Sequence, residues 1–365
     1  MNNKLLSPKF LIFCAFLFFG LFMIMQAVIG DSFEEVSGSA LPKKGRNLEI
    51  EPILPPGSLG DWAATTPLPG GALPYSKYVS NENFVYVLGG SSGGVATRTV
   101  RFAPFNSNGA IGSWSETTPL PIGLSQHGAI IYGEYLYVMG GDRVAPDVRF
   151  SKIDSSGSLG PWMIMDSDFD LGAQRDNFPV VGYNGYLFVI GGNVAGRDGG
   201  SVLHSQVNSA DGSVGFWTPT LALPNSLSFH AAVLNNDYVY VIGGAKDSVD
   251  SSEVLYGRIN QSGEIDSWTQ TTPLPTPRSG HGAVVYNNRI YVIGGSSQSN
   301  GTNVIFAPIL SDGGIGAWTN TTQLPSSRIL STPLVNKGRI YVLGDKNGLP
   351  DVIYSTVSGL VPVLN

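Results

Sequence analysis

Cysteine, histidine and basic residues are scarce in this chain of 365 residues. Its single cysteine, Cys14, excludes an intramolecular disulfide and a cysteine-based metal cluster. Lysine and arginine number 21 against 27 acidic residues, a net charge of −6. Residues 1–30 hold two lysines and no acid, so the rest of the chain has 19 bases and 27 acids, a net of −8. This acidic balance argues against nucleic acid as a partner, because binding a phosphate backbone needs a basic surface.

Long hydrophobic runs are confined to residues 10–29, which contain one polar residue. At about 1.5 Å per residue, a helix of this length spans roughly the 30 Å hydrocarbon core of a bilayer. Lysines precede the run and acids follow it, which predicts a cytoplasmic N-terminus at 1–9, a single-pass signal anchor at 10–29 and an exported remainder. A cleaved signal peptide, which would leave a secreted protein, is the alternative. Residues 30–57 show little periodicity and predict a linker.

Glycine, in contrast, is abundant, and it marks an internal repeat. An aromatic-aliphatic run ends in Gly-Gly five times and in Gly-Asp once, and the first glycines are spaced by 51, 51, 52, 51 and 50 residues. The six tryptophans recur with the same period, so two markers indicate tandem units. The markers are Gly89, Gly90, Gly140, Gly141, Gly191, Gly192, Gly243, Gly244, Gly294, Gly295 and Gly344, with Trp62, Trp114, Trp162, Trp217, Trp268 and Trp318.

Each unit contains four strand-like stretches. In the fifth unit these are HGAVVY (281–286), RIYVIGG (289–295), NVIFAPI (303–309) and IGAWTNTT (315–322). Glycine-containing turns precede most of the tryptophan stretches, as hairpins of this length require. Four antiparallel strands recurring every 40–50 residues are typical of a propeller blade. The sequence therefore predicts an all-β protein with six blades.

The order of aliphatic run, Gly-Gly, third strand and tryptophan strand resembles the kelch repeat over residues 58–357. The resemblance implies a six-bladed kelch-type β-propeller at 58–365. The last repeat has Asp345 in place of its second glycine and has no tryptophan strand after it. An unpaired tryptophan strand stands instead at the front of the domain. We expect residues 58–66 to pair with 352–357 as the fourth strand of the last blade, which leaves no open sheet edge in the ring.

Histidine and arginine recur where the first strand of a unit begins. The three histidines stand 13 residues before their Gly pairs, and the three arginines stand three residues before the same position of their own units. They are His127, His230 and His281, and Arg175, Arg278 and Arg328. In kelch domains that bind acidic peptides, arginine at this place lines the pocket, so one interpretation is a channel mouth for an acidic ligand. The alternative is that these residues fasten blades together by hydrogen bonds.

Metal sites have weak support. Asp166, Asp168 and Asp170 alternate as in a calcium loop, but Leu171 holds the position of the loop glycine and Asn177 that of the final glutamate. We interpret this segment as an acidic surface loop. The three repeat histidines lie in different units, whereas a tetrahedral metal site needs closely converging ligands.

The leading functional hypothesis is an extracytoplasmic, membrane-tethered kelch propeller that binds a protein or glycan and catalyses nothing. The repeat shows no acid/base, nucleophile or metal constellation, and no cofactor is expected. Galactose oxidase shares the kelch architecture, but its chemistry needs a tyrosine crosslinked to cysteine, and no cysteine follows Cys14. The alternative is a sugar-processing propeller enzyme of the sialic-acid mutarotase type. A monomeric propeller and an acidic ligand, either a sialylated or uronic glycan or an acidic protein loop, complete the expectation.

Overall fold

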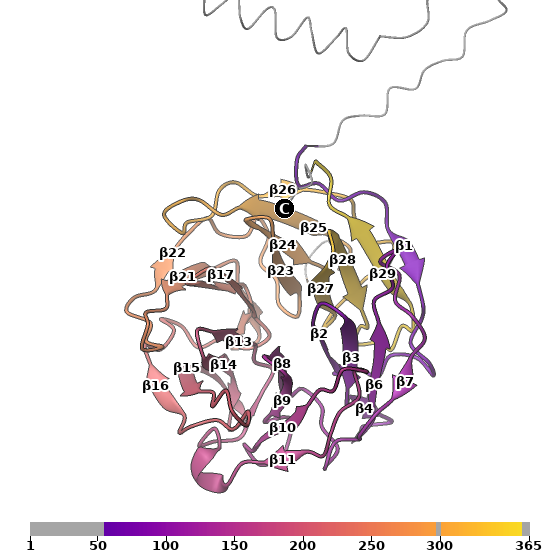
Figure 1. Ribbon diagram of the computed structural model, residues 1–365. Helices are drawn as coiled ribbons and strands as arrows, with labels where there is room; N and C mark the ends of the chain where they lie inside the picture. Colours follow the sequence, from indigo (N-terminus) through magenta and orange to yellow (C-terminus); the bar gives the residue numbers. More distant parts are fainter. Residues whose placement is uncertain (1–54, 297–300, 360–365) are drawn as a thin grey trace, which may run out of the picture. The chain divides into compact units, whose positions relative to one another are not determined.

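The computed structural model describes residues 55–296 and 301–359, which form six radial sheets around a central axis (Figure 1). This arrangement confirms the predicted all-β, six-bladed propeller. The described part of the chain contains one helical turn, η1 (Ser167–Phe169). The segments at 1–9 and 10–29 and most of the linker at 30–57 lie outside the described residues, so the anchor and signal-peptide predictions are not tested. Among the described residues, no helix is long and apolar enough to cross a membrane.

The blades repeat one order of four antiparallel strands from the centre to the rim. Blade 1 contains β2 (Lys77–Ser80), β3 (Phe84–Leu88), β6 (Val100–Pro104) and β7 (Ser115–Glu116). Blade 2 contains β8 (Gly128–Tyr132), β9 (Tyr135–Met139), β10 (Val148–Lys152) and β11 (Met163–Ile164). Blade 3 contains β13 (Val180–Tyr183), β14 (Tyr186–Val194), β15 (Arg197–Gln206) and β16 (Thr218–Thr220).

The other three blades have the same order. Blade 4 contains β17 (Ala231–Asn235), β18 (Tyr238–Ile242), β21 (Val254–Arg258) and β22 (Thr269–Gln270). Blade 5 contains β23 (Gly282–Tyr286), β24 (Arg289–Ile293), β25 (Val304–Pro308) and β26 (Thr319–Asn320). Blade 6 contains β27 (Thr332–Asn336), β28 (Arg339–Leu343), β29 (Val352–Thr356) and β1 (Ala63–Thr65).

Additional strands extend the connections between second and third strands. Blade 1 has a hairpin of β4 (Ser91–Ser92) and β5 (Val95–Ala96), and blade 4 has a hairpin of β19 (Ala245–Lys246) and β20 (Val249–Asp250). In blade 3, β14 and β15 are themselves longer than their counterparts, and β12 (Arg175–Asp176) pairs with the end of β14. These extensions all lie at the end of the ring where the first strands begin, because the second strands return to that end. We call this end the mouth face.

The predicted closure of the ring is confirmed. Strand β1 pairs antiparallel with β29, with Ala63 opposite Tyr354 and Thr65 opposite Val352, and Leu59 forms a bridge with Val357. The segment before the first blade thus supplies the outermost strand of the last one. In Figure 1 the indigo β1 lies beside the yellow β29. Both ends of the propeller are therefore held in one sheet.

The Gly-Gly pairs lie where each blade packs closely against the next. Gly294 and Gly295 have φ of 67° and 94°, a region that side chains disfavour. The Gly295 amide donates 2.8 Å to the carbonyl oxygen of Arg328 in blade 6, and a side chain on Gly294 would collide with the same oxygen. In blade 6, where Asp345 replaces the second glycine, its carboxylate accepts hydrogen bonds from the amides of Asn347 and Leu349 instead. The repeated glycines are therefore required by the approach of neighbouring blades.

Aromatic side chains form hydrogen bonds between adjacent blades. The Tyr86 hydroxyl of β3 donates 2.8 Å to the Gly157 carbonyl in the next blade, and second-strand tyrosines in four other blades make the same bond. The Trp318 indole donates 3.1 Å to the Thr272 carbonyl of the preceding blade. Trp217 alone among the six has no such bond, because the segment after β11 departs from the usual Thr-Thr-Pro-Leu-Pro sequence. The tryptophans are packing residues at one repeated position.

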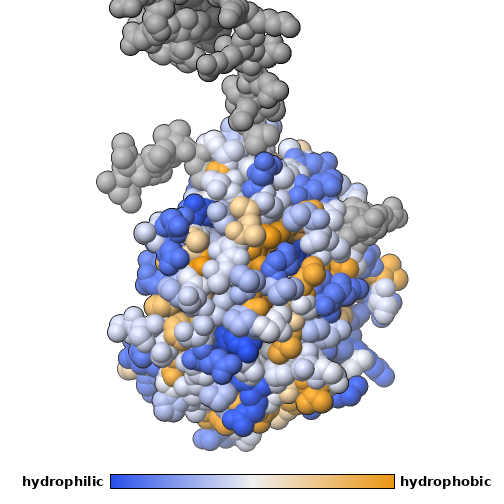
Figure 2. Space-filling model, turned by 90° about the vertical axis from the view of Figure 1, so that its right-hand side faces the viewer, coloured by the Kyte–Doolittle hydropathy of each residue, from blue (hydrophilic) through white to orange (hydrophobic). Residues whose placement is uncertain are grey.

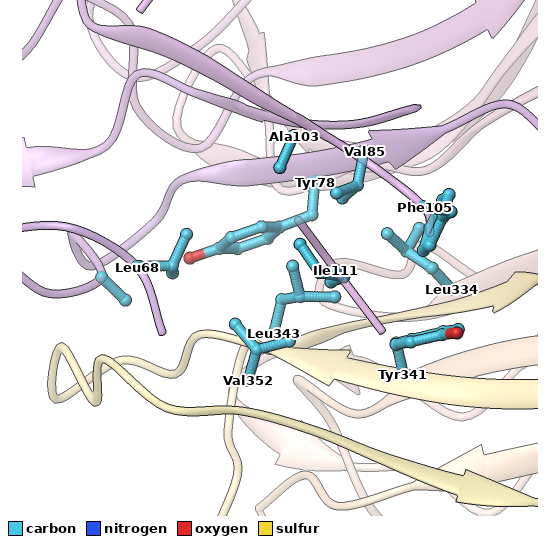
Figure 3. Packing of buried hydrophobic residues seen from close by; sticks show 11 residues of the cluster. Leu68, Tyr78, Val85, Ala103, Phe105, Ile111, Leu334, Tyr341, Leu343 and Val352 are labelled. Atoms are coloured by element: carbon cyan, nitrogen blue, oxygen red, sulfur yellow. The ribbon is translucent and has the colours of Figure 1, made fainter. Parts of the chain in front are cut away.

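The hydrophobic core is divided among the spaces between consecutive blades. Between blades 6 and 1, the rings of Tyr78 and Tyr341 lie near Leu343, Val352 and other aliphatic side chains (Figure 3). On the outer wall that Figure 2 shows, hydrophobic side chains are scattered among hydrophilic ones. Each blade thus buries both of its faces against neighbours, and closure of the ring completes the core.

Candidate binding site at the channel mouth

Six residues with left-handed backbone conformation form a ring where the first strands begin. Each stands directly before the repeat position that holds histidine in three blades. The ring, which we call the mouth ring, consists of Tyr75, Gln126, Asn177, Phe229, Gly280 and Leu330, all with φ between 52° and 62°. Each of the last five donates its backbone amide to the carbonyl oxygen of the one before it, at 2.7–3.2 Å. The mouth ring is therefore a nearly complete circle of backbone hydrogen bonds.

Polar side chains join two members of the mouth ring. The Asn177 amide group donates 2.5 Å to Oε1 of Gln126 and 2.6 Å to Oδ1 of Asp176. Burial raises the pKa of Asp176 to about 6, while its bond to Asn177 acts in the opposite direction. The acid therefore gains a proton in mildly acidic solution, which would change the hydrogen bonding of this side of the mouth.

Beneath the mouth ring, the channel holds a cavity of about 180 Å³. It is lined by the mouth ring and by the first residues of the six innermost strands, which surround the centre in Figure 1. Most lining side chains beyond the ring are small, and among the described residues that line the cavity Lys77 of β2 is the only lysine or arginine. Lys77 is half-buried, and the partial loss of water around its ammonium lowers its pKa to about 8.

The arginines that the sequence placed at the mouth are buried and bonded within their own blades. Arg278 is 1% exposed, and its guanidinium donates 3.3 Å to the Gly294 carbonyl and 2.9 Å to Oδ1 of Asn303. Arg175 donates 2.5 Å to the Gly191 carbonyl and 2.7 Å to Oγ of Ser201.

Arg328 follows the same pattern and pairs with Asp351. The main-chain carbonyls of Arg175, Arg278 and Arg328 accept amides from the preceding blade. None of the three is among the described residues that line the cavity. The arginine side chains therefore bond within their own blades. The bonds between blades come from the main chain, and Leu124 and Leu227 accept equivalent amides at the same repeat position.

The repeat histidines are buried and uncharged. Burial lowers the pKa of His127 to about 3, of His230 to about 4 and of His281 to about 3. All three imidazoles lie against the first glycine of the preceding blade's Gly pair, and His230 and His281 also line the cavity. Within the described ranges, no group of three or more histidine, cysteine or acidic side chains is placed to hold a metal ion.

The acidic segment after β11 forms the η1 turn on the surface. Asp166 and Asp168 are exposed, and Asp170 accepts a 2.6 Å hydrogen bond from the Gly172 amide. Asp170 thus stabilises its own turn, and the segment matches the interpretation as an acidic surface loop.

Sequence reasoning missed Lys77 and the mouth ring. One signal for Lys77 was available, because the equivalent position in the other units holds glycine, proline, alanine or threonine. The mouth ring had no such signal, since its side chains share no chemistry and only their backbone conformation is common.

Comparisons with known proteins agree with this architecture. The model of the KLHDC2/KLHL20/DRC7 Kelch-repeats domain matches residues 162–360. Beta-scruin of Limulus polyphemus is 34% identical over 90 residues, which cover 23% of this chain and 9% of that protein. Kelch repeat and BTB domain-containing protein 1 of Ectromelia virus (strain Moscow) is 27% identical over 214 residues, covering 58% and 36% respectively. The match thus spans less than a tenth of beta-scruin and little more than a third of the viral protein.

The solved structure of YjhT superposes with a TM-score of 0.62 at 13% sequence identity. The match covers 80% of this chain and 95% of that one. At this identity the likeness concerns the fold alone.

Proposed function

Since the chain belongs to the kelch-repeat family, we propose that it is a binding module that docks a protein partner on its mouth face. The observation that carries the proposal is the set of extended connections around the mouth. Exposed aliphatic side chains stand on two of them, Val95 at 70% and Val249 at 69% exposure. Loops that a rigid scaffold holds in position carry a large share of binding residues in proteins.

Isolated β-bridges hold each connection in place. They join it to the residues that precede the first strand of the following blade or of the same blade. Thr97 forms a bridge with Leu124, Gly199 with Leu227, and Ser228 with Ala245. A groove of about 540 Å³ runs between the blade 3 and blade 4 hairpins, beside Phe229 of the mouth ring. The loops therefore form a preorganised surface, which lowers the entropic cost of docking.

The proposal includes an extracytoplasmic location, supported by the apolar run at 10–29 and its flanking charges. We expect the propeller to be digested when protease is added outside intact cells. Protection from external protease with digestion only after lysis would contradict this location.

A photo-crosslinking amino acid at position 249 tests the docking surface. We expect a covalent protein adduct from position 249 and none from position 82, since Glu82 lies in the β2–β3 turn at the opposite end of the ring. Replacing Val95 by Ser should weaken the adduct. Equal adducts from both positions, or none from position 249, would overturn the proposal. An adduct whose crosslinked partner contains no peptide would identify a glycan ligand instead.

A further inference from the structure

The channel cavity contains a lysine that no acid neutralises. Lys77 lines the cavity, and its ammonium has no hydrogen-bond or ion-pair partner among the described residues. The equivalent residues of the other blades are Gly128, Pro179, Ala231, Gly282 and Thr332. The charge is therefore peculiar to blade 1 and plays no part in the repeated packing.

Neutral polar groups line the same cavity. Ser331 is 5% exposed, and its Oγ has no hydrogen-bond partner in the part of the chain that the structure describes. The buried imidazoles of His230 and His281 carry no charge at neutral pH. The described residues that line the cavity include no aspartate or glutamate, and Asp176 at the mouth is bonded to Asn177.

Lys77 is half-buried. An ammonium that is partly removed from water without a counter-charge is unfavourable, and a bound anion relieves that cost. With a pKa of about 8, Lys77 still carries its proton at neutral pH. The buried arginines Arg175, Arg278 and Arg328 are bonded within their own blades and add no free positive charge to the cavity. The single charge of Lys77 therefore suits an anion that carries one negative charge.

The size of the cavity restricts the ligand further. Its volume is about 180 Å³. An apolar cavity of about 150 Å³ in a protein holds benzene. The ligand is therefore a small molecule of roughly this size, whereas a folded segment of another protein does not fit.

We propose that the channel cavity binds a small monocarboxylate, with its carboxylate group on the Lys77 ammonium and with Ser331, His230 and His281 as neutral polar neighbours. The site lies beneath the mouth ring and is distinct from the projecting loops. It does not depend on the docking of a protein partner.

Isothermal titration of the full-length protein with acetate tests the site, with acetamide as the neutral isostere. We expect saturable binding of acetate and at least about tenfold weaker binding of acetamide, because a charge-assisted bond contributes that much. Lys77→Met should weaken acetate binding about tenfold or more. Lys337→Met, which removes an exposed lysine in the turn between β27 and β28, should leave it unchanged.

Absence of saturable acetate binding, equal binding of acetamide, or full binding by Lys77→Met would each overturn the proposal. A carboxylate can come from a small molecule or from an acidic side chain of a protein partner, and titration with an acidic peptide distinguishes the two. Binding of the peptide without binding of acetate would show that Lys77 serves protein docking instead. Should Lys77→Met fail to fold, carbon-13 NMR of the reductively methylated wild-type protein gives the pKa of Lys77. Acetate should raise this pKa, and an unchanged value contradicts the proposal.

Discussion

At the scale of single residues, the direction in which a side chain points decides whether it can bind a ligand in the channel, and residue type alone does not. Arg278 and Lys77 both stand at the beginning of an innermost strand, and the sequence offered only the arginine as a ligand group. In the folded ring the arginine turns into its own blade, while Lys77 lines the channel. The two residues occupy different repeat positions, since Arg278 stands three residues before the histidine position and Lys77 one residue after it. The period places both at the mouth, but which of the two positions faces the channel follows from the fold of the strand entry.

Arg278→Ala provides a residue-scale prediction. The substitution removes bonds to the Gly294 carbonyl and to Asn303 and leaves space around a nearly fully buried side chain. We expect the free energy of unfolding to fall by about 2–3 kcal/mol in urea denaturation. Arg197→Ala, at an exposed position of β15, should change it by less than about 0.5 kcal/mol. Unchanged stability together with weaker binding of an acidic ligand would instead support the arginine-lined mouth.

At the scale of strands and blades, the sequence was highly informative. The glycine pairs, second-strand tyrosines and tryptophans are each required by a contact with a neighbouring blade, so their period predicted both the number of blades and the closing strand. The hairpins β4–β5 and β19–β20 and the long β14–β15 connection were not predicted. They lie outside the repeated contacts, so no periodic residue marks them.

Strand β1 carries the element-scale prediction. Removing residues 1–66 deletes β1 and buried Leu59, the bond from Tyr291 to the Gly57 carbonyl, and the bond from Trp62 to the Thr322 carbonyl. Loss of one buried leucine and several hydrogen bonds should lower the free energy of unfolding by at least about 4 kcal/mol. Thermal unfolding should therefore separate this truncation from one that removes only residues 1–54. Identical melting of the two proteins would show that β1 does not stabilise the ring.

At the scale of the whole molecule, the ring buries three uncharged histidines at equivalent positions of three blades and so couples folding to pH. The pKa values of His127, His230 and His281 are lowered to about 3, 4 and 3 by burial, from an ordinary value near 6.5. Below pH 6.5 the unfolded chain takes up protons that the folded chain does not, so the free energy of unfolding falls as the pH falls. Asp176 acts in the opposite direction between about pH 4 and 6, since its folded pKa is raised.

The histidines outnumber this acid by three to one, so we expect net destabilisation between pH 6.5 and about 4. Each histidine contributes up to about 1.4 kcal/mol per pH unit, and urea denaturation at several pH values measures the sum. His281→Ser is the matched variant, because Ser331 occupies the equivalent position in blade 6. As the pH falls, the free energy of unfolding of this variant should decrease by up to about 1.4 kcal/mol per pH unit less than that of the wild type, because one fewer histidine takes up a proton on unfolding. If wild-type stability were flat across this range, the three imidazoles would have to be as well hydrated in the folded protein as in the unfolded chain, which their burial contradicts.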